Sequence, residues 1–189
     1  GHFTRTSNRH DYALAPFSKT ALDSLKDAGL DVIGVGKIPD IFVDQGITRK
    51  IKTVSNEDGM NKTIELASDN FNGLAFINLV DFDAVYGHRR NAAGYGKAIE
   101  EFDVQLGELI NELKNDDLLM VTADHGNDPT YRGTDHTREQ VPLIIYSKQF
   151  NEMKVLNDSN SFGIIGSTIC DNFNVKYNGI GSSILELLK

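Results

Sequence analysis

Metal-binding side chains are concentrated in one short stretch of the sequence, VTADHGNDPTYRGTDHTRE, residues 121–139. The stretch carries three aspartates and two histidines, which are Asp124, His125, Asp128, Asp135 and His136. Neutral imidazole and ionised carboxylate together suit borderline to hard divalent cations such as zinc, manganese or iron. The stretch therefore predicts a metal site.

A second group of such side chains lies in VDFDAVYGHRRN, residues 80–91. Asp83 and His88 are five residues apart with Gly87 between them, a spacing that we interpret as a loop wrapped around a cation. Any one of these side chains alone could instead cap a helix or a turn. The occurrence of both groups in one chain favours the metal interpretation.

Alternating helices and strands must position these two groups. Hydrophobic periodicity predicts helices over residues 18–29, 56–71, 92–114 and 162–173. The first is expected to begin at Ser18 as its N-cap and to end at Gly29. In the third, we expect the buried stripe to include Ile99. Apolar runs predict strands within residues 30–36, 73–83, 116–126 and 141–147.

This alternation predicts an α/β fold with a mostly parallel sheet and helices on both faces. Ligands of such sheets bind outside the carboxyl ends of the strands. Asp81 and Asp83 follow one predicted strand, and Asp124 and His125 follow another. We therefore expect the two groups to lie close together in space.

Four sequence blocks, in order, resemble the phosphopentomutase family of the alkaline phosphatase superfamily. They are TRTSNRHDYAL, GVGKIPDIF, NLVDFDAVYGHRRN and TADHGNDPTYRGTDHTREQVPLIIYS. The resemblance implies an alkaline phosphatase-like core and an enzyme with two Mn²⁺ ions. It also implies interconversion of ribose or deoxyribose 1-phosphate and 5-phosphate through a phosphothreonine, with a sugar bisphosphate as intermediate and activator.

The resemblance also implies a role for individual residues. Asp83, His88 and His136 match the ligands of one manganese ion. Asp124 and His125 match ligands of the other.

Two cationic residues match family positions that grip the sugar phosphate. These are Arg5 and Lys37. Arg89 and Arg90, next to His88, are expected to reach a phosphate or a carboxylate without binding metal themselves.

The sequence opens on GHFTRTSNRHDY without an initiator methionine, and we expect it to be part of a longer protein. Residues 1–14 are interpreted as the end of a cap domain and its return linker, and residues 15–189 as the metal-binding core. The family's nucleophilic threonine and one further metal-binding aspartate are expected in a preceding segment. The chain alone is therefore expected to lack mutase activity.

Composition narrows the classes of partner. The chain has 27 Asp and Glu against 19 Lys and Arg, a net charge of −8, which argues against nucleic-acid or anionic-membrane binding. The lone Cys170 lies in an apolar stretch and fits a reducing, cytoplasmic location. Two alternatives stay open: an enzyme resembling cofactor-independent phosphoglycerate mutase, which uses a serine nucleophile, and a non-catalytic metal-binding fragment.

Overall fold

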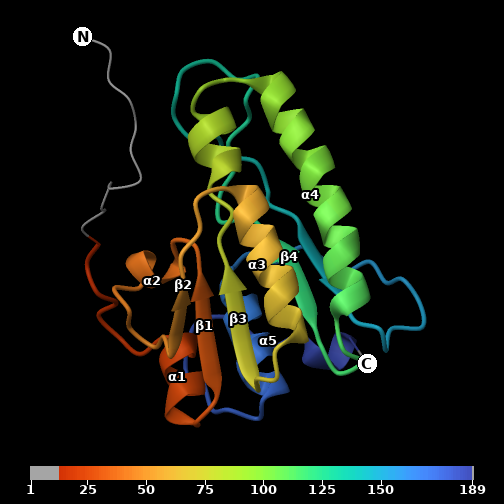
Figure 1. The fold of residues 1–189 in the computed structure, drawn as a ribbon. Helices are drawn as coiled ribbons and strands as arrows, with labels where there is room; N and C mark the ends of the chain where they lie inside the picture. Colours follow the sequence, from red (N-terminus) through yellow and green to blue (C-terminus); the bar gives the residue numbers. More distant parts are fainter. Residues whose placement is uncertain (1–12, 189) are drawn as a thin grey trace. The chain divides into compact units, whose positions relative to one another are not determined.

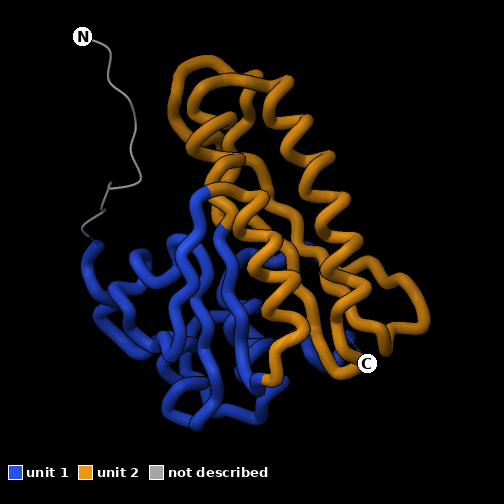
Figure 2. Tube along the Cα trace, viewed as in Figure 1, with its two compact units in different colours: residues 1–54, 71–78, 157–189 blue, residues 55–70, 79–156 orange. Residues whose placement is uncertain are grey.

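The computed structural model describes residues 13–188, which divide into two compact units. Among the described residues, one unit consists of residues 13–54, 71–78 and 157–188, and the other of residues 55–70 and 79–156 (Figure 2). Each unit is described separately.

The first unit is built on a three-stranded parallel sheet (Figure 1). Its strands are β1 (Asp31–Val35), β2 (Arg49–Ile51) and β3 (Gly73–Ile77), in the order β2-β1-β3. In the register, Ile33 of the central strand lies opposite Arg49 on one side and Ala75 on the other. The helices of this unit are α1 (Ala21–Asp27), α2 (Ile38–Ile41), α5 (Gly163–Asn172) and the short 3₁₀ helix η2 (Leu185–Leu187).

The core of the first unit lies where α1 and α5 meet β1. Its buried members are Leu22, Leu25, Val32, Ile38, Ile47 and Cys170. Ile33 and Val35 point to the opposite face of β1 and are buried as well. Burial on both faces explains why this strand is a continuous apolar run without alternation.

The second unit carries the two sequence groups that contain the candidate ligands. It comprises α3 (Asn56–Ser68), a π-helix η1 (Phe82–Gly87), α4 (Ala92–Glu112), β4 (Leu119–Thr122) and β5 (Leu143–Tyr146). Phe82 fixes η1 against α4, because its ring lies 5.6 Å from that of Tyr95 and 6.1 Å from that of Phe102, centroid to centroid.

The predicted α/β fold with a parallel sheet and helices is confirmed, and all four predicted helices are present. One strand pair differs from the expectation of a single parallel sheet, because β4 and β5 form a separate antiparallel pair. The connection between them, residues 123–142, contains no helix. Parallel neighbours need a crossover connection, usually a helix, whereas antiparallel neighbours can be joined by a loop.

Two local expectations are wrong. The N-cap of α1 is Thr20, not Ser18, because Thr20 and Asp23 form a reciprocal capping box. On α4, Ile99 is 48% exposed and Ala98 is buried in its place. Ala98 is three residues from Tyr95 and four from Phe102, a spacing that keeps it on the inward face of the helix.

No helix among residues 13–188 is both long and apolar enough to span a bilayer.

The capping box of α1 predicts an acid-sensitive contribution to stability. Burial alone would raise the pKa of Asp23, but hydrogen bonds from Gln45 and Thr20, together with the charge of Lys19, hold this pKa below its ordinary value. The stabilisation is therefore present above the unfolded carboxyl pKa of about 3.9 and is lost as the pH falls through the lower folded value. Asp23→Ala should reduce the free energy of unfolding by about 1 kcal/mol at pH 7, measured by urea denaturation.

Asp27→Ala is the matched control on the same helix. Asp27 pairs with Lys19 at 2.6 Å, but both side chains are more than half exposed, so Asp27→Ala should reduce the free energy of unfolding far less than Asp23→Ala does. Equal losses for the two variants at pH 7, or an Asp23→Ala deficit that persists unchanged at pH 2, would contradict the role of the capping box.

Candidate metal centre

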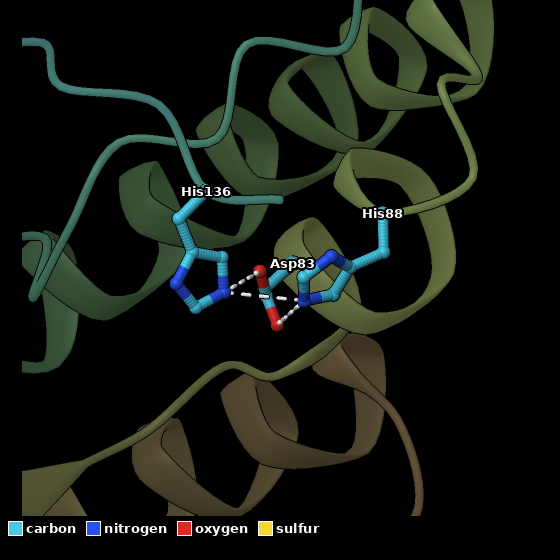
Figure 3. A group of neighbouring side chains, drawn as sticks. All are labelled: Asp83, His88 and His136. Carbon is cyan, nitrogen blue, oxygen red and sulfur yellow. Dashed lines mark hydrogen bonds and ion pairs between the residues drawn. The ribbon is translucent and has the colours of Figure 1, made fainter. Parts of the chain in front are cut away.

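Three side chains direct their metal-binding atoms at one point, with these atoms within 4.8 Å of one another (Figure 3). The Nε2 atom of His136 lies 3.2 Å from Asp83 Oδ1 and 3.1 Å from His88 Nε2. His88 Nε2 lies 3.4 Å from Asp83 Oδ2. Figure 3 shows the carboxylate between the two imidazole rings. One carboxylate and two imidazoles at this separation fit a borderline divalent cation.

The π-helix is what places Asp83 and His88 on the same side. The His88 N–H donates to the carbonyl of Asp83 at 3.0 Å, an i→i+5 hydrogen bond. In an α-helix, residues five apart point about 140° away from each other, because each residue adds about 100°. The expectation of a loop between these residues is therefore wrong: a helical turn of π type performs the convergence.

The hydrogen bond of His88 to the backbone determines which ring nitrogen is available. Its Nδ1 lies 2.5 Å from the carbonyl oxygen of Thr134. A carbonyl oxygen carries no proton, so Nδ1 must be the donor. In the neutral ring this leaves the lone pair on Nε2, the atom that faces Asp83 and His136. This arrangement is the one that metal-binding histidines usually have.

Asp124 and His125 lie beside this group. The ring of His125 stacks on that of His136 with centroids 3.7 Å apart and an angle of 18° between the planes. The Nε2 atom of His125 is 3.7 Å from Asp124 Oδ2, and the Asp124 side chain is 75% exposed. The structure thus brings all five predicted ligands into one neighbourhood, with only Asp83, His88 and His136 converging tightly. The role of all five as ligands stays a prediction.

Other acidic side chains of the two sequence groups serve the fold. Asp81 accepts from the backbone N–H of Asn56 at the start of α3, and Asn56 Oδ1 accepts from the backbone N–H of Asp81. Asp128 accepts from the N–H and the hydroxyl of Thr130, both at 2.7 Å. These two hydrogen bonds, hydroxyl first, hold the pKa of Asp128 below its ordinary value. Both carboxylates are therefore turn and cap acceptors.

The charge of Asp83 contributes to a shift in the pKa of Tyr95. Burial, and to a lesser extent the negative charge of Asp83, raises the pKa of Tyr95 on α4. Tyr95 therefore stays a neutral phenol at physiological pH, with its ring packed on Phe82.

Sequence reasoning missed Asn127, which directly supports the site. Its side chain donates to Asp83 Oδ1 at 2.7 Å, and the residue is only 8% exposed. The only signal in the sequence was its position, two residues after His125 in the metal-capable stretch. An asparagine in a loop rich in Gly and Thr is read more readily as a turn residue.

Of the two predicted substrate-binding residues, Lys37 lies among the described residues and Arg5 does not. Lys37 belongs to the other compact unit, where it follows β1 and Gly36 and forms the N-cap position of α2. Arg5 lies outside the described residues, as do His2 and His10. The guanidinium of Arg90 donates to backbone and amide oxygens of the same unit.

The fold is α/β, and the converging donor set is of a kind that could hold a metal ion. The chain matches the metalloenzyme superfamily over residues 1–177 and belongs to that superfamily. The alkaline phosphatase-like α/β core expected from the sequence is thereby confirmed.

Two solved structures resemble the chain in fold. Phosphoglycerate mutase of Leishmania mexicana, from crystals at low cobalt concentration, matches with a TM-score of 0.68 and 18% identity, covering 89% of this chain and 39% of that one. The PH0037 protein of Pyrococcus horikoshii matches with a TM-score of 0.52 and 19% identity, covering 65% and 34%. The chain thus spans well under half the length of these proteins, and the likeness shows the fold.

The packing of Gly87 on Asn127 gives a testable prediction. A Cβ atom at Gly87 would lie 2.5 Å from Asn127 Nδ2 and 2.7 Å from Asn127 Cγ, closer than packed atoms approach. Gly87→Ala should therefore push Asn127 away from Asp83 and reduce the free energy of unfolding by about 1–3 kcal/mol, measured by urea denaturation. Gly96→Ala on α4 is the control, because a Cβ there meets nothing within 4 Å. Gly96→Ala should stabilise the protein by up to about 1 kcal/mol. A Gly87→Ala variant as stable as Gly96→Ala would show that the packing of Gly87 on Asn127 is unimportant.

Proposed function

We propose that the protein containing this chain is a metal-dependent phosphoryl-transfer enzyme, a phosphopentomutase that interconverts pentose 1-phosphates and 5-phosphates. The observation that carries the proposal is the convergence of the Asp83, His88 and His136 donor atoms within 4.8 Å. Membership of the metalloenzyme superfamily supports a metal-dependent enzyme. The four sequence blocks support the pentose phosphate as substrate.

The donor set fits a divalent cation, and the proposal assigns it manganese. Asp83, His88 and His136 would hold one ion, and Asp124 and His125 would contribute to a second, with a further ligand from a preceding segment. Bound cations of this kind neutralise phosphoryl oxygens and lower the pKa of an attacking hydroxyl. The protein contributes the fixed orientation of the ligands, through the π-helix and the hydrogen bond of His88 to Thr134.

The remaining parts of the proposed reaction concern the phosphate carrier and the substrate. A threonine outside this chain would carry the phosphoryl group, and Arg5 and Lys37 would grip the sugar phosphate through charge and hydrogen bonds. The bisphosphate formed by transfer to the sugar must turn over before water reaches it, which requires a shielded site. The proposed location is the cytoplasm.

Metal binding is tested by removing one donor. In the wild-type chain, Mn²⁺ at 100 times its Kd should stabilise the fold by about 2.7 kcal/mol, a rise of about 5–10 °C in Tm for a domain of this size. His136→Ala should abolish most of this rise, because the Nε2 atom opposite Asp83 is gone. The measurement is thermal unfolding with and without Mn²⁺.

Asp135→Asn is the matched control, because Asp135 precedes His136 and contributes its backbone carbonyl, which the substitution leaves in place. It should keep the Mn²⁺-dependent rise in Tm. A rise that survives His136→Ala, or that is equally lost in Asp135→Asn, would remove His136 from the proposed site.

The substrate class is tested in the full-length protein. With Mn²⁺ and a sugar bisphosphate activator, ribose 1-phosphate should be converted to ribose 5-phosphate, and 3-phosphoglycerate should stay unconverted. His88→Ala should reduce turnover at least 100-fold, because a lost ligand removes both metal affinity and transition-state charge stabilisation. Conversion of 3-phosphoglycerate alone would assign the protein to the phosphoglycerate mutase alternative.

A further inference from the structure

The guanidinium of Arg90 binds the backbone of the loop that carries His136. Its Nε donates to the carbonyl of Gly133 at 2.5 Å, and its Nη2 donates to the carbonyl of Asp135 at 2.6 Å. Its Nη1 donates to the carbonyl of Asp128 at 2.7 Å and approaches that of Gly87 at 3.2 Å. A planar side chain with five N–H donors suits such a fork, and a lysine does not.

Three successive carbonyls before His136 are held in this way. Arg90 donates to the carbonyl oxygens of Gly133 and Asp135, and His88 Nδ1 donates to the carbonyl oxygen of Thr134 between them. The chain immediately ahead of His136 is therefore tied to the segment that immediately follows η1. These contacts link the segments that carry His88 and His136.

Arg90 also reaches Asp83 through Asn127. Arg90 Nη1 donates to Asn127 Oδ1 at 2.8 Å, and Asn127 Nδ2 donates to Asp83 Oδ1 at 2.7 Å. The guanidinium thus fixes which way the amide of Asn127 points, because its oxygen must face Arg90 and its nitrogen must face the carboxylate. Gly87 leaves the space in which this amide lies.

The backbone of Arg90 has a conformation that arginine rarely adopts. Its φ is +53°, in the left-handed region, which is uncommon for residues other than glycine. Its N–H still donates to the carbonyl of Gly87 at 3.0 Å, so the turn is closed by hydrogen bonding. Such strained positions persist where the surrounding contacts determine them and are concentrated at functional sites. Glycine or asparagine would adopt this conformation more readily, but neither could make the contacts of the guanidinium.

We propose that Arg90 is a positioning residue which, through Asn127 and the carbonyls of residues 133–135, holds Asp83, His88 and His136 at the separation a divalent cation requires. The inference rests on the proposed metal site and adds to it the residues that build its geometry. Arg90 acts through backbone and amide oxygens, because each of its three guanidinium nitrogens donates to at least one of them.

The test compares metal affinity in variants of Arg90 and of its neighbour Arg89. Mn²⁺ affinity is measured by titration followed by electron paramagnetic resonance of the free ion, and fold stability is measured separately by urea denaturation without metal. Arg90→Asn suits the left-handed backbone, so the fold should survive, but the Kd for Mn²⁺ should rise by about 10- to 100-fold. Arg90→Lys keeps the charge but not the fork, and its Kd should rise nearly as far. Arg89→Asn, on an exposed residue of the same turn, should leave the Kd within about two-fold of wild type.

The link through Asn127 is tested by a double-mutant cycle. Asn127→Ala alone should raise the Kd about 10-fold or more, and the combination with Arg90→Asn should raise it much less than the product of the two single effects. A wild-type Kd in Arg90→Asn, or fully multiplicative effects in the double variant, would overturn the proposal. If the wild-type chain binds no Mn²⁺, the proposed metal site fails; if wild type binds and the Arg90 variants bind equally well, only the positioning role fails.

Discussion

The i→i+5 hydrogen bond from the His88 N–H to the carbonyl of Asp83 is the interaction on which the candidate site depends. In an α-helix, two residues five apart would point in different directions, whereas this π-type turn places both side chains on the same side. The turn that contains it is unusual, and Phe82 packed on Tyr95 and Phe102 holds it to α4. A long and regular helix therefore supports a short and irregular one, and the irregular one carries the ligand candidates.

The third donor comes from a segment with almost no regular structure. Residues 123–142 connect β4 to β5 without a helix, and the only bridge inside them pairs Gly126 with Thr137. Such a loop would ordinarily be mobile, because few backbone groups are paired. Here its carbonyls accept from Arg90 and His88, and the Asp128 N–H donates to Thr137 Oγ1 at 2.6 Å. Hydrogen bonds from polar side chains thus hold this loop in place, as backbone hydrogen bonds hold a strand in a sheet.

The sequence predicted the elements better than the details that complete the site. Apolar periodicity located four helices and four of the strands, because burial of a face leaves a regular pattern in the sequence. It missed β2, which is three residues long and mostly exposed, and it missed η1, because a π-turn has no sequence period of its own. The ligand candidates could be predicted from residue type, since imidazole and carboxylate side chains are common metal ligands. Residue type could not give Asn127 or the role of Arg90, because both act through hydrogen bonds between segments more than 30 residues apart, which a single sequence does not reveal.

The exposure of the three converging side chains bears on the kind of metal site that they could form. Structural metal sites are closed by four protein ligands, whereas catalytic sites keep a position open to water or substrate. The three converging side chains keep 33–46% of their surface exposed, while Asn127, which donates to Asp83, and Gly87 are buried. A cation held there would have protein on one side and solvent on the other. This openness fits the proposed catalytic role, because a substrate phosphate needs free access to a bound cation.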